Sequence, residues 1–393
     1  MLVMRSRPAR VSLVLGGLLA VGGGASDGRA GDFASEVVEY APAPGQFINN
    51  AQFNDPTKAL GAPVGAGTIE GDLTKIVSLG GFGGSITLRF SETVWDDPRN
   101  PMGLDFIVFG NAFWLNGVPT QRSGEAAVIE IARDVNGDGA PGTWYVIPGS
   151  SMASPPMKAH RERMWTRGSG SSHAPAHPAW YPGETHYPGF PDDYTTATYE
   201  LDAELIPSGP FAVIENPNGP SAQEEAHWGY GDLSPALRLG DLTGNNVVDA
   251  PGMDPADFYT VPDDPFLVGI MPGSGGGDAF DIAWAVDPAT GAPANLDGFD
   301  FIRISTGLDA LMGPGGVLGE LSVEVGGVAR VRRAGPSADL NGDGVVNAQD
   351  LGVLLGSWGV CPADALCAAD INGDGVVNAQ DLGELLGQWG AMR

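Results

Sequence analysis

The sequence is poor in positive charge. It has 20 Lys and Arg residues against 48 Asp and Glu residues, and its formal net charge is -28 at pH 7. A chain with this charge is repelled by the phosphates of nucleic acids and by anionic membrane surfaces. We therefore expect no nucleic-acid partner, and the charge suits a soluble exported protein.

Long apolar runs are missing after the first residues. Arg5, Arg7 and Arg10 precede an apolar stretch from Val11 to Gly24, which is shorter than the roughly 20 residues of a membrane-spanning helix. This order of charge, short apolar run and small residues predicts a signal peptide over residues 1–30 and a secreted or cell-surface location. A membrane anchor is the alternative interpretation. No later segment is apolar enough to span a membrane in the mature chain.

Cysteine is scarce, with only Cys361 and Cys367 in the chain. A zinc site needs more ligands than this pair provides. In an exported chain the two residues either form a small disulfide loop or stay free, and the spacing leaves both states open.

Recognisable catalytic motifs are absent as well. The sequence has no G-x-S-x-G, no H-E-x-x-H and no phosphate-binding loop. His173 and His177 have the spacing of a helical metal pair, but Pro175 and Pro178 prevent a regular helix there. We interpret residues 152–193 as a long surface loop, whose aromatic side chains either pin the loop or stack on sugar rings.

Glycine and proline, in contrast, are abundant, with 60 and 32 residues. Short apolar runs bounded by Gly, Pro, Asn or Asp predict strands in GSITLRF, GLDFIVFGNAF, TWYVIPG, FAVIEN, AFDIAWAVD, GFDFIRIST and GELSVEVGG. We therefore predict a mainly β chain in which residues 31–330 form a β-sandwich or jelly roll. The similar stretches Gly103–Ile107 and Gly298–Ile302 are expected to be core strands from two ends of one sheet.

The most informative feature is a duplication. The stretch Ala338–Gly359 returns at Ala369–Gly390 with three substitutions, Leu340/Ile371, Val353/Glu384 and Ser357/Gln388. In each copy oxygen-bearing residues stand at positions 1, 3, 5, 7, 9 and 12 of a loop that has Gly at position 6, and this pattern predicts a calcium loop. The predicted ligands are Asp339, Asn341, Asp343, Val345, Asn347 and Asp350 in the first loop and Asp370, Asn372, Asp374, Val376, Asn378 and Asp381 in the second.

A short helix is predicted after each loop. Its apolar residues recur at helical spacing: Leu351, Leu354, Leu355 and Trp358, then Leu382, Leu385, Leu386 and Trp389. Asn347 and Asn378 are expected to cap the helices, and Gly359 and Gly390 to stop them. Because one loop and one helix cannot bury an apolar face alone, we expect the two copies to pack against each other. Glycines inside the helices suggest that the helices approach closely.

Two loop–helix units without entering helices, each with Asp at position 12, resemble a type I dockerin from Ala338 to Gly390. The resemblance implies that two calcium ions fold residues 338–393, and that a near-symmetric surface then docks to a cohesin domain. It also implies that loop positions 10 and 11 help to select the partner. Those residues are Ala348, Gln349, Ala379 and Gln380. They differ from the Ser/Thr pairs of cellulosomal dockerins, and the repeats most resemble those of secreted planctomycete proteins. The expected partner is therefore a cohesin-like domain or a cell-envelope protein.

Residues 36–328 resemble a family of secreted bacterial cell-surface proteins that are thought to be β-sandwiches, and the resemblance implies no activity. Residues 331–337 would then be a linker. Further candidate calcium positions are Asp134, which Asn136 and Asp138 follow, and Asp241, which Asn245 and Asp249 follow. At Asp134 the sequence favours a polar β-turn over a calcium site.

These patterns favour a secreted, non-catalytic protein whose calcium-binding repeats attach a β-sandwich to a cohesin-like or cell-surface partner. The alternative hypothesis is an extracellular glycoside hydrolase that degrades polysaccharides, or a carbohydrate-binding protein, delivered by the same repeats.

We predict that the isolated segment 337–393 is largely unfolded in a chelator and gains helix when calcium is added, because the loops order only around the ion. The double substitution Asp343→Ala and Asp374→Ala should abolish that gain in circular dichroism. An unchanged spectrum of the unsubstituted segment on adding calcium would contradict the prediction.

Overall fold

The computed structural model describes residues 31–43, 47–48, 50–81, 83–149, 211–212, 229–264, 269–307, 322–332, 338–341, 343–362, 367–372 and 375–391. The predicted signal peptide, the predicted loop over residues 152–193 with its histidines and aromatic residues, and Asp374 lie outside these residues. Among the described residues, no helix combines the length and the hydrophobicity needed to cross a bilayer.

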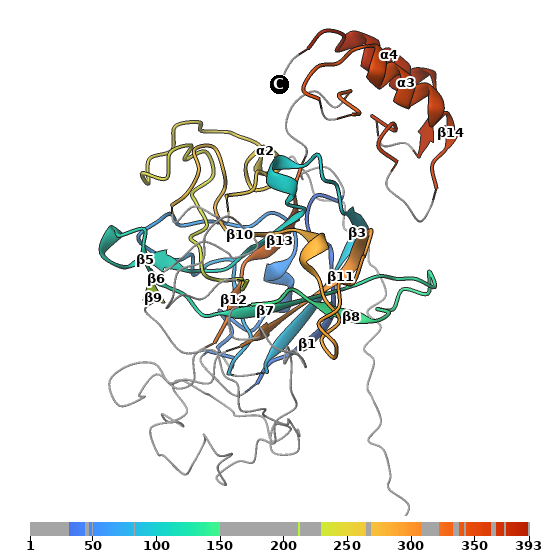
Figure 1. The fold of residues 1–393 in the computed structure, drawn as a ribbon. Coiled ribbons are helices and arrows are strands. Elements are labelled where there is room, and N and C mark those ends of the chain that lie inside the picture. The colour runs from blue at the N-terminus through green and yellow to red at the C-terminus, as the bar shows by residue number, and fades with distance from the viewer. Residues whose placement is uncertain are drawn as a thin grey trace, which may run out of the picture.

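The predicted mainly β fold is confirmed, and every strand pairing is antiparallel (Figure 1). The largest sheet has five strands, in the order β1 (Glu36–Ala41), β3 (Ser85–Trp95), β11 (Gly298–Thr306), β7 (Ala127–Ala132) and β8 (Trp144–Val146). A three-stranded sheet has the order β10 (Asp278–Phe280), β4 (Phe106–Phe109) and β13 (Gly327–Arg330).

Shorter elements complete this part of the chain. The small sheets are β12 (Glu324–Val325) with β2 (Val77–Ser78), and β5 (Phe113–Trp114) with β6 (Gln121–Ser123) and β9 (Phe211–Ala212). The short helices are η1 (Pro56–Ala59), η2 (Pro101–Gly103), η3 (Leu115–Gly117), α2 (Pro255–Phe258) and η6 (Ile282–Trp284).

Aromatic side chains join the two larger sheets into a sandwich. The ring of Phe106 on β4 lies 4.9 Å from the ring of Phe299 on β11, and 5.2 Å from Phe280 on β10. Phe90 on β3 packs edge-on against Phe299 at 5.7 Å. These residues belong to one buried cluster that draws on both sheets, as sheet-on-sheet packing requires.

The three-stranded sheet is buried on its other face too. Ile107 and Phe109 of β4 belong to a second cluster with Leu237, Phe258 and Tyr259, which come from the segment that contains α2. Burial on both faces explains why β4 reads as the continuous apolar run FIVF, without the alternation of a half-exposed strand.

Two sequence expectations for the sandwich need correction. The alternating stretch AFDIAWAVD is not one strand, because β10 ends at Phe280 and Ile282–Trp284 forms a 3-10 turn. The carboxylate of Asp281 caps that turn by accepting from Ala283 N at 2.7 Å. The similar stretches around Ile107 and Ile302 lie in different sheets, so their likeness reflects a shared burial in the core rather than one sheet.

The duplicated segment forms two helices, α3 (Ala348–Gly356) and α4 (Ala379–Gly387), and a strand pair, β14 (Gly359–Val360) with β15 (Val376–Val377). Its core takes the same positions from both copies, which confirms that the copies pack against each other. The buried residues are Ala338 and Ala369, Val346 and Val377, Leu354 and Leu385, with Leu340.

Each loop pairs with the chain that follows the helix of the other copy. Gly390 N donates to Val346 O at 2.8 Å, and Cys361 N donates to Gly375 O at 2.9 Å. The helices end at Gly356 and Gly387, before the glycines expected to stop them. Gly359 and Gly390, with φ of 129° and 78°, instead turn the chain back toward the opposite loop.

Two expectations about the helices are wrong in part. A Cβ atom on any of the four glycines inside the helices would meet open space, so close helix approach does not explain them. Only Leu354 and Leu385 of the predicted apolar faces are fully buried, and Leu351 and Leu382 are partly buried. The remaining leucine and tryptophan of each predicted face stay about half exposed, and the tryptophans lie just beyond the helix ends: Leu355, Trp358, Leu386 and Trp389.

We predict that Phe106→Ala lowers the free energy of unfolding of the sandwich by about 3–5 kcal/mol, because the ring is fully buried between two sheets. Urea denaturation of the full chain measures the change. Val38→Ala, on the exposed side of β1, is the control and should change stability by less than about 0.5 kcal/mol. Similar small effects of both substitutions would contradict the sandwich core described above.

Candidate functional site

The first candidate site is the loop that precedes α3. Asp339 at its first position accepts from Gly344 N at 3.0 Å, and Gly344 has φ of 88°. Asn341 accepts from Asp343 N at 3.0 Å, and Asp343 accepts from Val345 N at 3.0 Å. Successive side-chain oxygens are therefore held in one tight turn, in the order that the sequence predicted.

Asp350 connects this loop to its helix. The side chain is fully buried, and its Oδ1 accepts from Leu340 N at 2.8 Å and from Asn341 N at 3.1 Å. Its Oδ2 accepts from Asn347 N at 2.7 Å, while Asn347 accepts from Gln349 N. Asn347 and Asp350 thus form a capping box, which confirms the predicted N-cap.

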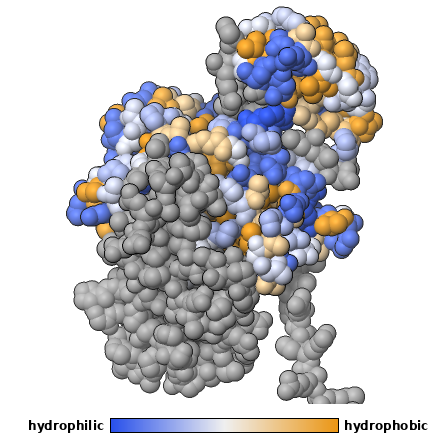
Figure 2. All heavy atoms as spheres, in the orientation of Figure 1, coloured by the Kyte–Doolittle hydropathy of each residue, from blue (hydrophilic) through white to orange (hydrophobic). Residues whose placement is uncertain are grey.

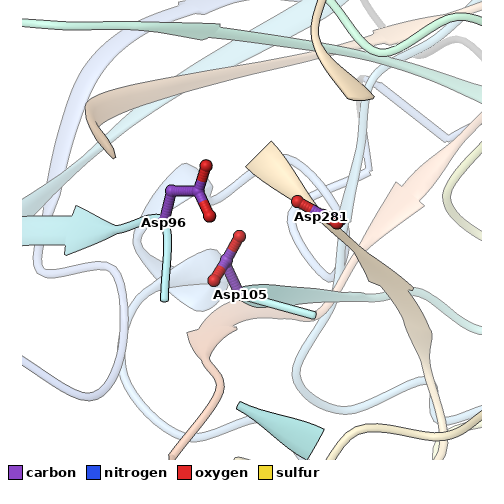
Figure 3. Close-up of side chains that lie close together, drawn as sticks. All are labelled: Asp96, Asp105 and Asp281. Carbon is purple, nitrogen blue, oxygen red and sulfur yellow. The ribbon is translucent and has the colours of Figure 1, made fainter. Parts of the chain in front are cut away.

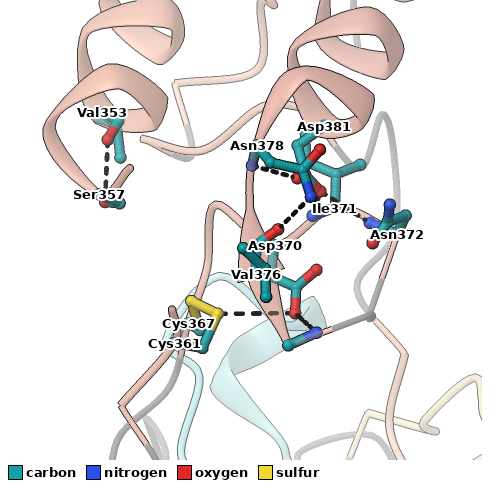
Figure 4. Close-up of a disulfide and its surroundings, with 11 residues drawn as sticks. Val353, Ser357, Cys361, Cys367, Asp370, Ile371, Asn372, Val376, Asn378 and Asp381 are labelled. Carbon is teal, nitrogen blue, oxygen red and sulfur yellow. Dashed lines mark hydrogen bonds between the residues drawn. A yellow bond between two sulfur atoms is a disulfide. The ribbon is translucent and has the colours of Figure 1, made fainter. Parts of the chain in front are cut away.

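The second loop repeats this geometry (Figure 4). Asp370 accepts from Gly375 N at 2.7 Å, and Gly375 has φ of 82°. Asp381 accepts from Ile371 N, Asn372 N and Asn378 N at 2.8, 3.2 and 2.8 Å. The two copies therefore fold alike although they differ in sequence at Leu340 and Ile371.

The charges in both loops favour a cation. Hydrogen bonds from Asn341 and then from Val345 N hold the pKa of the Asp343 carboxyl below its ordinary value. Burial acts to raise the pKa of Asp381, but backbone N–H groups, led by that of Asn378, lower it overall. The aspartate carboxylates and the asparagine amides of each loop present oxygen atoms, and Val345 and Val376 can add their backbone carbonyl oxygens. This set fits calcium, a hard cation that takes six to eight oxygens.

The predicted partner-selecting residues lie at the start of the helices. Ala348 and Gln349 are exposed at the first turn of α3, and Ala379 and Gln380 are exposed at the first turn of α4. Gln349 Oε1 also accepts from Asn341 Nδ2 at 2.9 Å, so this side chain contacts its own loop.

Cys361 and Cys367 form a disulfide, which settles the state that the sequence left open. Figure 4 shows the disulfide beside the second loop, where Cys361 Sγ lies 3.6 Å from Asp370 Oδ2. The bridge therefore spans the connection between the two copies and adjoins the first position of the second loop.

The two other predicted calcium positions form hydrogen-bonded turns. Asp134 accepts from Asp138 N and Gly139 N and is 3.4 Å from Arg89 Nη2. An arginine partner agrees with the polar turn that the sequence favoured there. Asp241 is fully buried, and its two oxygens accept from four backbone N–H groups.

Two clusters of carboxylates were not anticipated from the sequence. Asp96, Asp105 and Asp281 form one (Figure 3), and Glu125, Asp232 and Glu324 form the other. Asp105 directly precedes β4 and Asp281 directly follows β10, and the pairing of Phe106 with Phe280 brings them together. Only the strand pairing shows this proximity, because the two residues are far apart in the chain.

The Asp96 cluster has raised pKa values. Burial raises the pKa of Asp105 to about 8, and the neighbouring charges of Asp281 and Asp96 also act to raise it. Hydrogen bonds from the backbone N–H groups of Asp97 and Ile282 act in the opposite direction. Burial also raises the pKa of Asp281 to about 6, with Asp96 adding to the shift. These carboxyls bind their protons more tightly in the folded state than in the unfolded state. Their contribution to stability is therefore present near pH 4 and is lost as the pH rises toward 8.

We predict that Asp281→Asn raises the melting temperature of the sandwich at pH 8 by about 2–4 °C, corresponding to about 1 kcal/mol, and has little effect at pH 5. Asparagine removes the charge but can still accept from Ala283 N. Asp254→Asn is the matched control, because Asp254 caps α2 through Ala256 N in the same way and lies outside the cluster. Equal shifts at both pH values would contradict the prediction.

Comparison with known proteins agrees with the geometry of the loops. Residues 337–386 match the family model described as the dockerin type I domain. No curated protein matches the chain. Dockerin domains bind calcium and cohesins and generally belong to extracellular or cell-surface proteins. Residues 337–386 of this chain are therefore a type I dockerin domain.

Proposed function

We propose that this protein is a secreted, non-catalytic protein whose dockerin domain binds two calcium ions and attaches the β-sandwich to a cohesin-like partner on a scaffold or cell surface. The observation that carries the proposal is the coincidence of the dockerin match with two loops of near-identical hydrogen bonding. In this proposal residues 1–30 are the signal peptide and residues 331–337 the linker.

Each loop would hold one ion through the oxygens of its predicted ligands, Asp374 included. When bound, calcium supplies a positive centre that offsets the repulsion among the carboxylates. Asp350 and Asp381 would keep each loop joined to its helix through their backbone bonds. The ions would thus fix the positions of α3 and α4.

Exposed apolar side chains supply a docking face of matching composition in each copy. In the first copy Leu355 on α3 is 54% exposed and Trp358, just beyond the end of α3, is 49% exposed. In the second copy Leu386 on α4 is 54% exposed and Trp389, just beyond the end of α4, is 48% exposed. Hydrophobic residues are visible on the surface of this domain in Figure 2. Large apolar and aromatic residues that stay exposed in a folded unit are typical of protein-binding surfaces.

The two faces differ at two positions, because Val353 on α3 corresponds to Glu384 on α4 and the exposed Ser357 corresponds to Gln388. A partner that accepts either face should therefore tolerate a carboxylate at the first position and a longer amide side chain at the second. If the faces are equivalent, a substitution in one copy leaves the other copy able to dock.

We predict that Trp358→Ala or Trp389→Ala alone weakens partner binding less than about tenfold, while the double substitution weakens it at least about a hundredfold, because aromatic anchors carry much of the binding energy. The chain is immobilised on a sensor surface, and the affinity of purified cohesin domains and of envelope proteins for it is measured, once with calcium and once with a chelator. Val360→Ala, an exposed apolar change outside the helices, is the control. Retention that survives both the chelator and the double substitution would contradict the proposed docking.

A further inference from the structure

The second carboxylate cluster joins three distant parts of the sandwich. Glu125 lies between β6 and β7, Asp232 lies in the segment after Gly229, and Glu324 is on β12. One carboxylate oxygen of each residue lies within 4.8 Å of one oxygen of each of the others.

Asp232 is fixed in place by the backbone. Its Oδ1 accepts from Asn111 N at 2.9 Å and Ala112 N at 3.1 Å, and its Oδ2 accepts from Glu324 N at 3.1 Å. Asp232 has φ of 56°, a conformation that a non-glycine residue keeps only when its surroundings enforce it. A Cβ atom on Gly110 would stand 2.0 Å from Asp232 Oδ1, so the backbone there must stay without a side chain.

Glu125 is the member that lacks a partner. It is 9% exposed, and no hydrogen bond or ion pair joins its carboxylate to any residue that the structure describes. Glu324, in contrast, accepts from Ser78 Oγ at 2.9 Å. An ionised carboxylate that is buried without a counter-charge is destabilising, and a bound cation would offset that cost.

Glu125 and Glu324 line a cavity of about 270 Å³. Its other polar lining residues are Asn111, Ser78 and Ser123, and the rest are apolar. Among the described residues, no Lys, Arg, His or Cys lines it. The available donors are therefore oxygens, which favour a hard cation over zinc or copper.

The place of the cluster adds an electrostatic argument. The three carboxylates are shielded from water, and in the ionised state they repel one another unless a cation lies between them.

We propose that Glu125, Asp232 and Glu324 bind one hard divalent cation, such as calcium, at the wall of this cavity. The ion ties β12, the Asp232 turn and the segment before β7 together, and water in the cavity completes its coordination. The site is separate from the dockerin loops and from the turns at Asp134 and Asp241, and it does not depend on the docking function.

Calorimetric titration of the full chain with calcium, and separately with magnesium, tests the site. The background carries Asp343→Ala and Asp374→Ala, so that the dockerin loops do not contribute. We expect a residual site for at least one of the two ions, and Glu125→Gln should weaken it at least about tenfold, as loss of a ligand does. Glu39→Gln, an exposed acidic residue on β1, is the control and should leave it unchanged. Absence of binding for both ions, or binding unaffected by Glu125→Gln, would overturn the proposal.

Thermal unfolding in the same background separates lost binding from lost folding. In a chelator, Glu125→Gln should melt at or above the temperature of its parent, because one repelling charge is gone. The saturating cation should raise the melting temperature of the parent and not that of the variant. Glu324→Gln, which can still accept from Ser78, provides a second variant with the same expectation. If the cation stabilises neither the parent nor the variants, protons rather than a metal neutralise the cluster and the proposal fails.

Discussion

The dockerin domain depends on one repeated interaction, the bonding of a buried carboxylate to three backbone N–H groups. Asp350 ties the second and third residues of its loop to the N-cap of α3, and Asp381 does the same for α4. The same aspartates are predicted calcium ligands. A single side chain thus connects the ion-binding turn to the helix that carries the exposed docking residues, and ordering the loop orders the helix.

Because the segment is duplicated, this interaction occurs at equivalent positions in both copies. Each loop pairs with the chain beyond the other helix, and the core takes equivalent residues from each copy. Neither copy can bury Leu354 or Leu385 alone. The exposed apolar residues are consequently duplicated as well: Leu355 and Trp358 in the first copy, and Leu386 and Trp389 in the second. Symmetry of the core therefore produces two similar candidate surfaces for one partner.

Local rules made the dockerin segment predictable from sequence. Ligand spacing, the Asn caps and the turn glycines act within about 12 residues, so Asn347 and Gly344 could be assigned without knowing the rest of the fold. The exposure of half of each predicted apolar face could not be predicted. Helical spacing shows which residues share a face, but it does not show whether another part of the chain packs against that face. The helix glycines were misread for the same reason.

In the sandwich, the alternation in GSITLRF correctly indicated β3, yet the same signal in AFDIAWAVD was misleading. Asp281 ends that strand by capping a 3-10 turn, and Ile282 within the turn is buried, so the apolar pattern continues without a strand. The carboxylate clusters could not be predicted from the sequence, because their members are brought together only by strand pairings such as that of Phe106 with Phe280. Several of the acidic residues that make the net charge negative are buried, among them Asp105, Asp232 and Glu324.

Amide hydrogen exchange of the full chain, read by mass spectrometry with calcium and with a chelator, tests the central claim most directly. The account predicts that peptides from α3 and α4 lose protection when calcium is removed, while peptides from β3 and β11 keep theirs. Equal protection of α3 and α4 in both conditions would mean that calcium does not order the docking surface, and would contradict the account.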